Sequence, residues 1–336
     1  MSARRFLLRA VAAAGLFASA ALHATAAEKL PAYAIYASQS SVSGLSSGGY
    51  MAGQFAVAFS SSVAGAGIVA AGPYYCAQGQ PLRALNQCMA TRFGEPDAAG
   101  LLRIARRFAL AGEIDDLSSL ARQRIYLFNG ARDRTVLPSV GRQAREFYRL
   151  AGTPGADVAF VDDVPAGHGF VTTAFGNACE TSASPFVNDC DYDQAGAILR
   201  HIHPGLSPPS AKPGGRIVPF DQAEFLVDAR RYGLDETGYF YEPAACREGK
   251  RCRAHIVFHG CRQSHEAVGD AVYGKAGYNR WAETNNILLL YPQAAALPTN
   301  PNGCWDWFGY TGAGYATKSG PQMAAVKRML DRLAGN

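Results

Sequence analysis

The stretch Gly44-Leu45-Ser46-Ser47-Gly48 decides the fold of this chain. A serine that must stand clear of its backbone needs a sharp turn between a strand and a helix, and such a turn leaves room only for small residues on either side. The flanks agree, because a strand-like run over 39–42 precedes the stretch and an apolar helical run over 50–58 follows it. The G-x-S-x-G pattern therefore predicts a nucleophile elbow, with a glycine- and serine-rich loop as the plain alternative.

The beginning of the chain has the pattern of an export signal. Arg4, Arg5 and Arg9 precede an apolar run over 10–22, and small residues at 24–27 supply a cleavage site of the A-x-A kind. We therefore predict a signal peptide over 1–27 and a secreted or periplasmic protein. The apolar run is too short for a membrane anchor, so we expect no stable membrane insertion. The remaining 28–336 suffice for a single catalytic domain.

The charge balance gives little sign of a charged partner. The whole chain has a formal net charge of +5, and the three arginines of the signal account for three of these charges, so the mature chain is near +2. Only 18% of the residues are charged, and no long basic run occurs. We therefore expect an uncharged substrate and no nucleic-acid partner.

Eight cysteines, all in the mature region, agree with export to an oxidising compartment. Many pairings of eight cysteines are possible, and nearest neighbours suggest Cys76–Cys88, Cys179–Cys190, Cys246–Cys252 and Cys261–Cys304. No C-x-x-C occurs, and the close pair His201-Ile202-His203 is better explained as the end of a helix over 194–202 than as metal ligands. We expect neither a metal nor an organic cofactor.

Strand-like and helix-like segments alternate along the mature chain. The expected strands are 65–71, 124–128, 157–162, 238–241, 254–258 and 286–291, and the expected helices are 99–110, 140–150, 194–202 and 322–333. A stretch rich in Pro, Gly and Ser, 204–219, is typical of a linker or long surface loop. The alternation predicts an α/β fold whose mostly parallel sheet has helices on both faces.

Two loops that follow expected strands carry catalytic partners for Ser46. Asp133 is the acid in the loop after 124–128, where its carboxylate would accept the Nδ1–H of a histidine. His168 stands between two glycines in the loop after 157–162. The order Ser46, Asp133, His168 matches the nucleophile, acid and base of α/β-hydrolases. A turn cap, or an ion-pair partner for a neighbouring arginine, is the alternative role for Asp133.

The oxyanion hole explains the odd position of the elbow. One donor is the amide after the nucleophile, that of Ser47, and the other normally comes from a His-Gly loop upstream of the elbow. Here that loop, His259-Gly260-Cys261, lies far downstream. We therefore predict a circularly permuted α/β-hydrolase fold with its joint or linker near 204–219, the Cys261 amide as second donor, and a Cys261–Cys304 disulfide that holds the loop.

Four motifs together resemble the poly(3-hydroxybutyrate) depolymerases of the single-domain, circularly permuted type. They are the run 44–51, Asn129-Gly130 to Asp133, His259-Gly260-Cys261-Arg262-Gln263, and Asn302-Gly303-Cys304-Trp305-Asp306-Trp307. The resemblance covers essentially the whole mature chain. It implies Ser46, Asp133 and His168 as the catalytic residues, and the Ser47 and Cys261 amides as oxyanion donors.

The resemblance also implies a crevice that binds polyester. Trp305 and Trp307 are candidates for its tryptophan, with core packing as an equal alternative for each, and His259 and Tyr50 are expected beside it. Some relatives carry cysteine where this chain has Leu45. Many add a polymer-binding domain, whereas this chain ends soon after its last expected helix, so we expect no separate substrate-binding domain and a preference for amorphous polymer or soluble oligomers.

The expected function is ester hydrolysis, by a monomer, of poly(3-hydroxybutyrate) or its hydroxyalkanoate oligomers. A feruloyl or acetyl-xylan esterase would use the same three residues on plant-wall esters. An inactive polymer- or sugar-binding module is the rival from another class. The complete set of nucleophile, acid and base speaks against that rival.

Overall fold

The centre of the structure is an eight-stranded sheet. The structure, a computed structural model, describes residues 27–336, so the predicted signal peptide lies outside the described residues except for Ala27. Across the sheet the strands follow the order β4 (Val158–Val161), β3 (Arg124–Phe128), β2 (Val63–Val69), β1 (Ser40–Leu45), β10 (Arg253–Phe258), β11 (Ile287–Tyr291), β9 (Thr237–Glu242) and β8 (Arg216–Asp221). From β4 to β11 all neighbouring strands are parallel, whereas β9 is antiparallel to both of its neighbours, β11 and β8. This confirms the mostly parallel sheet.

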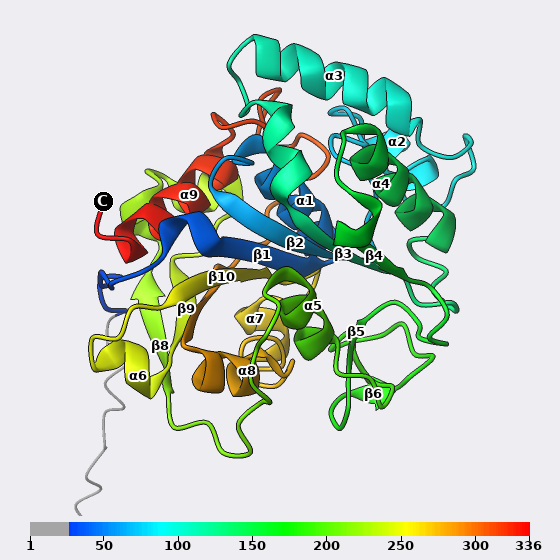
Figure 1. The fold of residues 1–336 in the computed structure, drawn as a ribbon. Coiled ribbons are helices and arrows are strands. Elements are labelled where there is room, and N and C mark those ends of the chain that lie inside the picture. The colour runs from blue at the N-terminus through cyan, green and yellow to red at the C-terminus, as the bar shows by residue number, and fades with distance from the viewer. Residues whose placement is uncertain (1–26) are drawn as a thin grey trace, which may run out of the picture.

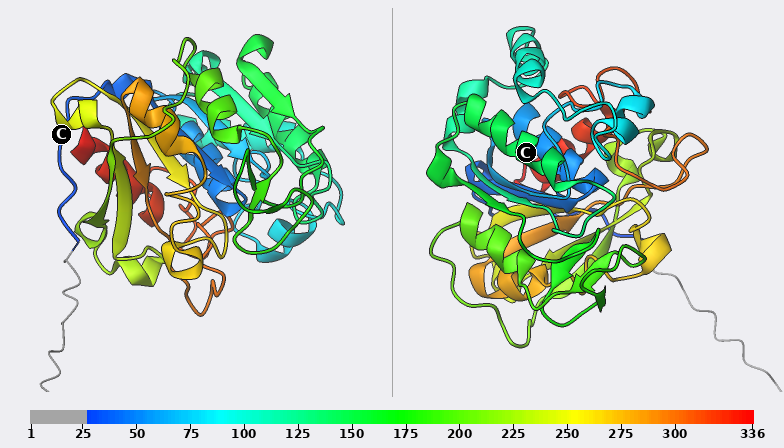
Figure 2. Two further views of the ribbon diagram at one scale, coloured as in Figure 1. Left: turned by 90° about the horizontal axis from the view of Figure 1, so that it is seen from below. Right: turned by 90° about the vertical axis from the view of Figure 1, so that its right-hand side faces the viewer.

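Helices cover both faces of the sheet (Figures 1 and 2). One face carries α1 (Ser47–Ala58), α2 (Pro81–Asn86), α3 (Ala98–Leu110), α4 (Pro138–Leu150) and α9 (Pro321–Leu333), and the other carries α5 (Gln194–Ile202) and α8 (Tyr278–Asn285). The one-turn helices α6 (Ala244–Arg247) and α7 (His265–Val268) follow β9 and β10. Successive strand residues point to opposite faces, so Ile125 joins the core on the α1 side and Tyr126 the core on the α5 side.

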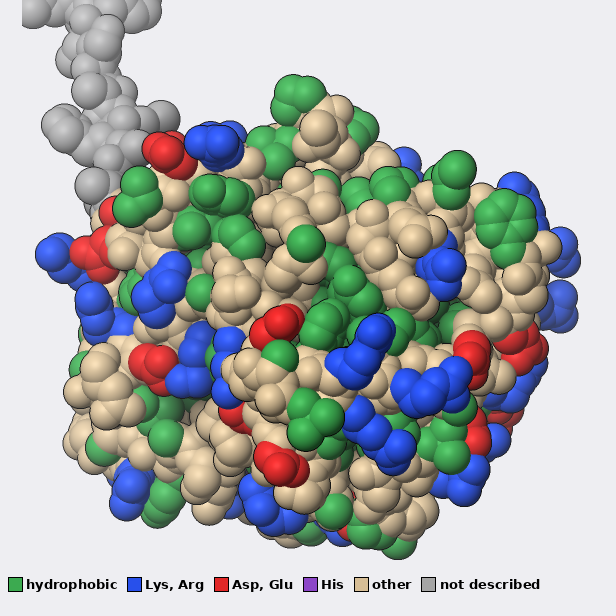
Figure 3. Space-filling view, turned by 90° about the horizontal axis from the view of Figure 1, so that it is seen from above, with side chains coloured by type: hydrophobic (Ala, Val, Ile, Leu, Met, Phe, Trp, Pro, Cys, Tyr) green, Lys and Arg blue, Asp and Glu red, His purple; other side chains and the backbone are tan. Residues whose placement is uncertain are grey.

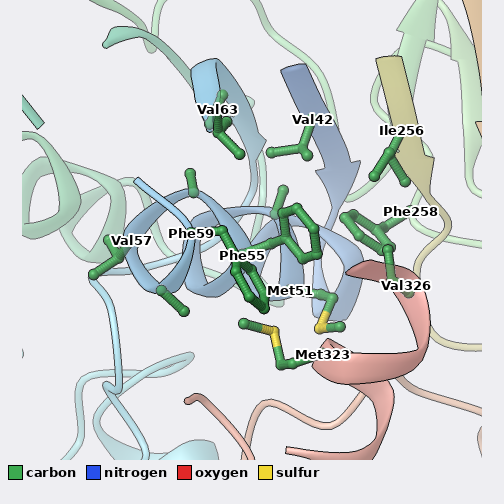
Figure 4. Close-up of a cluster of buried hydrophobic side chains, with 14 of the residues drawn as sticks. Val42, Met51, Phe55, Val57, Phe59, Val63, Ile256, Phe258, Met323 and Val326 are labelled. Atoms are coloured by element: carbon green, nitrogen blue, oxygen red, sulfur yellow. The ribbon is translucent and has the colours of Figure 1, made fainter. Parts of the chain in front are cut away.

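Helix α1 is buried along its whole length, which explains why it is apolar or small on every side. Its Met51 and Phe55 pack beneath Val42 of β1 and Ile256 of β10, while Met323 of α9 closes the cluster from the other side (Figure 4). The helix that follows the elbow is therefore wedged between the sheet and the last helix, which gives Ser46 a rigid support.

The order of strands β1 and β10 confirms the permutation predicted from the sequence. These strands are adjacent and parallel, with Gly44 opposite Phe258, although they come from the two different halves of the chain. The two ends of the described chain also meet, because the Tyr33 amide donates to the Leu333 carbonyl at 2.8 Å. The elbow therefore stands at the middle of the sheet even though it comes first in the sequence.

The stretch 204–219 is only partly a loop. The loop ends at Gly215, and β8 begins at Arg216 and pairs with β9. Pro219 is accommodated because β8 is an edge strand, where a missing N–H costs no ladder hydrogen bond.

A second, three-stranded sheet lies beside the main one and was not predicted. It contains β5 (Phe170–Thr172), β6 (Asn177–Ala178) and β7 (Val187–Asp189), in the order β5-β7-β6. The four disulfides join the cysteines as predicted, and one of them, Cys179–Cys190, spans this small sheet.

The surface and helix lengths add two observations. Basic and acidic side chains are both spread among hydrophobic ones on the face that carries α3 (Figure 3). Among residues 27–336, none of the helices is long and apolar enough to cross a membrane.

Candidate active site

Ser46 occupies a strained turn between β1 and α1. Its backbone has φ 57° and ψ −119°, and a residue other than glycine rarely adopts a positive φ. The Ser46 amide donates to the Val69 carbonyl at 2.8 Å. Both glycines of the motif are required by close packing. A Cβ on Gly44 would lie 2.3 Å from the Gly48 carbonyl oxygen, and one on Gly48 would lie 2.3 Å from that of Phe258. The structure therefore has the elbow that the sequence predicts.

The predicted acid and base are in direct contact. His168 Nδ1–H donates to Asp133 Oδ2 at 2.7 Å, and the two residues are only 6% and 3% exposed. The amides of Thr135 and Val136 donate to the other carboxylate oxygen at 2.8 and 3.0 Å, and the backbone N–H of His168 donates to Ser182 Oγ at 2.8 Å. This arrangement fixes the ring and leaves Nε2 as the nitrogen available for proton transfer.

Two cavities meet at Ser46. The first, of about 250 Å³, is apolar, and it is lined by Tyr50, Leu85, Trp307 and Phe308 among others. The second, of about 350 Å³, is more polar, and His168 lines it. The residues shared by both cavities are Ser46, Met89, Cys261 and Asn302. A substrate placed with its reacting carbonyl at Ser46 would extend into both.

Of the two predicted oxyanion donors, one directly follows Ser46 in the chain and the other lines both cavities. Ser47 is the first residue of α1, so its amide has no intrahelical acceptor. Cys261 lines both cavities, and within the described part of the chain its amide donates to no carbonyl or side chain. The loop is held by the disulfide to Cys304 and by the Gly260 amide, which donates to Gln263 Oε1 at 2.7 Å.

Of the two candidate tryptophans, the structure brings only Trp307 to the site. Its ring stacks on Tyr50 with a centroid distance of 4.3 Å, and both residues line the apolar cavity. The Tyr50 hydroxyl donates to the Cys88 carbonyl, which holds this pair in place. Trp305 is fully buried against Phe258, so core packing accounts for it.

His259 supports the oxyanion loop and does not line either cavity. Its Nδ1–H donates to the Gly260 carbonyl at 2.7 Å, and its Nε2 accepts from the Ala294 amide at 3.0 Å. Burial lowers the pKa of His259 to about 4, so the ring is neutral in neutral solution and keeps this pair of bonds. The expectation that His259 contacts substrate is therefore replaced by a structural role.

The histidines of the 201–203 pair face different partners. His201 Nε2 lies 3.0 Å from the Asp157 carbonyl, and His203 Nε2 lies 2.9 Å from Ser41 Oγ. Elsewhere in the described chain, ligand atoms of Asp235, His265 and Glu266 lie within 4.8 Å of one another. The Arg230 guanidinium stands 3.5 Å from Glu266 and 3.8 Å from Asp235, so a positive charge already occupies this cluster.

Several residues that line the cavities were not predicted from the sequence. Asn302 is the first residue of the motif over 302–307, and Met89 directly follows Cys88, so both are adjacent to residues that the sequence singles out. Ser182 had none, because its place beside His168 depends on the long-range pairing of the small sheet.

A strained serine at a strand–helix turn, next to a buried His–Asp pair on a mostly parallel sheet, is the arrangement of a serine hydrolase with the α/β-hydrolase fold. No protein-family model matches the chain. It is 36% identical over 319 residues to a polyhydroxybutyrate depolymerase of Talaromyces funiculosus, covering 90% of this chain and 91% of the relative. The chain belongs to the poly(3-hydroxybutyrate) depolymerase family.

Further comparisons agree. A poly(3-hydroxybutyrate) depolymerase of Delftia acidovorans is 43% identical over 314 residues, which are 92% of this chain and 62% of the relative, so the chain spans less than two thirds of that protein. The crystal structure of PHB depolymerase from Penicillium funiculosum has a TM-score of 0.84 at 35% identity, with 91% of this chain and 99% of that chain covered. A PHB depolymerase variant complexed with R3HB trimer has a TM-score of 0.85 at 34% identity and the same coverage.

Proposed function

We propose that this protein hydrolyses the ester bonds of poly(3-hydroxybutyrate) or of its soluble oligomers. The observation that carries the proposal is the 2.7 Å contact between Asp133 and His168 beside the two cavities that meet at Ser46. The substrate in the names of the relatives supports the same choice.

In the first step, His168 Nε2 takes the proton of Ser46 Oγ while Oγ attacks the ester carbonyl. Asp133 keeps the ring in the Nδ1–H tautomer and stabilises the imidazolium that forms. The negative charge on the carbonyl oxygen is stabilised by the amides of Ser47 and Cys261. The bond to the alcohol oxygen then breaks, and His168 gives its proton to that oxygen.

In the second step, water replaces the alcohol. His168 takes one proton of the water as its oxygen attacks the acyl carbon, and the same two amides hold the second oxyanion. The bond to Ser46 Oγ breaks and Oγ regains a proton from His168. The acyl part leaves as a carboxylic acid, which releases its proton to the solvent, and the enzyme returns to its starting state.

The apolar cavity is suited to an uncharged aliphatic chain. None of the described residues that line it is charged, and Trp307 offers an aromatic surface beside Ser46. A 3-hydroxybutyrate unit presents a methyl group and an ester, which such a surface binds by apolar contact. Amorphous polymer and soluble oligomers, whose units can enter a cavity one at a time, are the substrates that we expect.

Four disulfides and the N-terminal sequence pattern support export, and we place the enzyme in the periplasm or outside the cell. It is proposed to act as a monomer. Size-exclusion chromatography with light scattering would test this state directly.

A substrate panel tests the function. Wild-type protein should clear a suspension of amorphous poly(3-hydroxybutyrate) and cleave the 3-hydroxybutyrate trimer, whereas Ser46→Ala should lose several orders of magnitude in rate and escape labelling by a fluorophosphonate. Feruloyl and acetyl-xylan esters run beside them measure the rival activity. Cleavage of the plant-wall esters without clearing of the polymer would overturn the proposal, as would near wild-type hydrolysis by Ser46→Ala.

A further inference from the structure

We propose that Arg262 binds the free carboxylate at the end of a 3-hydroxybutyrate chain and thereby directs cleavage to the ester bond next to that end. The inference rests on the proposed function and adds a specificity-determining residue to it. It is carried by the position of Arg262 in the polar cavity, on the side of Ser46 where the alcohol half of the substrate must lie.

The two halves of the substrate can be assigned to the two cavities. The residue that protonates the leaving oxygen must stand within hydrogen-bond reach of it. His168 lines the polar cavity and not the apolar one, so the alcohol half belongs in the polar cavity and the acyl half in the apolar one. In a 3-hydroxybutyrate chain the alcohol half is the half that carries the carboxyl end.

Arg262 is the one arginine or lysine among the described residues that line the polar cavity, and none of these residues is acidic. None of the ion pairs among residues 27–336 includes Arg262, and its Cζ lies over the Phe186 ring, 4.9 Å from the centroid. A cation–π contact of this kind restrains the guanidinium beside the ring.

The backbone at Arg262 is also fixed. Its φ is 58°, in the left-handed region, and its amide donates to the Asn302 carbonyl at 2.7 Å. The residue directly before it is Cys261, whose disulfide to Cys304 joins the same two loops. The base of the arginine side chain is therefore held next to the proposed oxyanion donor, in the same cavity as Ser46.

These positions match the chemistry of a terminal unit. The carboxyl group of 3-hydroxybutyrate is ionised in neutral solution, because an ordinary carboxyl pKa is near 4. A guanidinium binds such a group with paired, charge-assisted hydrogen bonds. Hydrolysis of the adjacent ester adds water across the bond. The terminal unit leaves first, as free 3-hydroxybutyrate with a new hydroxyl group, and the acyl half leaves Ser46 with a new carboxyl group.

The test compares the 3-hydroxybutyrate trimer as its free acid with the same trimer capped as a methyl ester. The measured quantity is the ratio of kcat/KM for the free acid to kcat/KM for the methyl ester. We expect Arg262→Gln to lower this ratio about tenfold, a modest value for charge-assisted bonds at an exposed site. Arg262→Lys should restore part of the ratio, because it keeps the charge but loses the paired geometry. Arg106→Gln, which removes an exposed arginine of α3 that lines neither cavity, should leave the ratio unchanged.

A wild-type measurement supplies a second test that does not depend on the folding of a variant. Raising the ionic strength should lower the same ratio, because salt screens an exposed charge pair. A ratio that stays within twofold in Arg262→Gln, or that does not respond to salt in the wild type, would overturn the assignment of Arg262. Failure of the wild type to cleave either trimer is a different result, which would overturn the proposed function and this inference with it.

Discussion

Acid should destabilise this protein through a buried histidine at the end of α5. His203 is 6% exposed, and burial lowers its pKa to about 4, with the nearby Arg253 charge adding to the effect. Its Nε2 lies 2.9 Å from Ser41 Oγ on the central strand. Because the folded-state pKa is lower than the unfolded value of 6.5, the folded protein binds fewer protons there than the unfolded chain. The contribution of neutral His203 to stability is therefore complete above about pH 6.5 and is lost as the pH falls toward 4.

The size of the effect follows from the two pKa values. Between about pH 7.5 and about pH 4.5, a histidine whose pKa falls from 6.5 to about 4 reduces the free energy of unfolding by about 2.5 kcal/mol. His203→Gln removes this titration. At the higher pH we expect the variant to be less stable than the wild type by about 1 kcal/mol, for the lost hydrogen bond. At the lower pH the order should reverse, because only the wild type must keep the imidazole at position 203 neutral.

Urea unfolding followed by tryptophan fluorescence, with the disulfides intact, measures both free energies. Ser41→Ala is a comparison variant, since it removes a hydrogen-bond partner of both His203 and His255 and leaves both rings in place to titrate. Its free energy of unfolding should therefore still fall between the two pH values. A constant stability difference between His203→Gln and the wild type would refute the reasoning, because it would mean that the His203 ring has the same pKa in the folded and unfolded chains.

Two further changes test the elbow and the crevice. Gly48→Ala should lower the thermal midpoint strongly or prevent folding, because its Cβ would lie 2.3 Å from the backbone oxygen of Phe258. Gly53→Ala in the same helix is the control and should be neutral or stabilising, because its Cβ meets nothing closer than 3.4 Å. Equal midpoints for the two variants would contradict the packing argument. Trp307→Phe should raise KM for the 3-hydroxybutyrate trimer by more than KM for p-nitrophenyl acetate, because only the trimer extends along the apolar cavity; equal changes for both esters would remove Trp307 from the trimer site.

The main sheet could be predicted because its elements have clear local signals. Buried strands such as β3 and β11 are short apolar runs between turn residues, and the expected limits of α5 agree with the structure. The strands of the small sheet, β5 and β6 among them, contain two or three residues each. Such strands are held by distant contacts, so no periodicity in the sequence can reveal them.

The site divides in the same way. The positions of Ser46 and its glycines follow from backbone requirements that act within five residues. The nucleophile–acid–base order of α/β-hydrolases then selected Asp133 and His168. The roles of Trp305 and Trp307 could not be separated, because a buried turn between them decides which ring faces the crevice. That turn is built on Asp306, whose carboxylate accepts the Gly309 and Thr311 amides at 2.6 and 2.7 Å. This segment lies between β11 and α9 and contains no helix or strand whose periodicity could show which side chain is buried.

The serines of β1 explain how a permuted sheet keeps its active site aligned. A central strand is usually rich in branched apolar residues, but at two buried positions of β1 this strand has serine instead, Ser41 and Ser43. Their hydroxyls contact the two ring nitrogens of His255 on β10, each at 2.7 Å, and Ser41 stands directly opposite His255 in the strand register. Burial lowers the pKa of His255, so the ring stays neutral and can both donate and accept in this network.

A slip of one residue between β1 and β10 would turn these serines to the other face of the sheet and leave His255 without partners. The connection between the strands is far too long to set their register by itself, and the buried network adds a specific contact at one register. The proposed donors, Ser47 and Cys261, follow these two strands within three residues. A slip would displace one amide from the other by about 3.3 Å, which exceeds the tolerance of an oxyanion hole. We therefore infer that the buried Ser–His contacts help to align the amides of Ser47 and Cys261, the two proposed oxyanion donors.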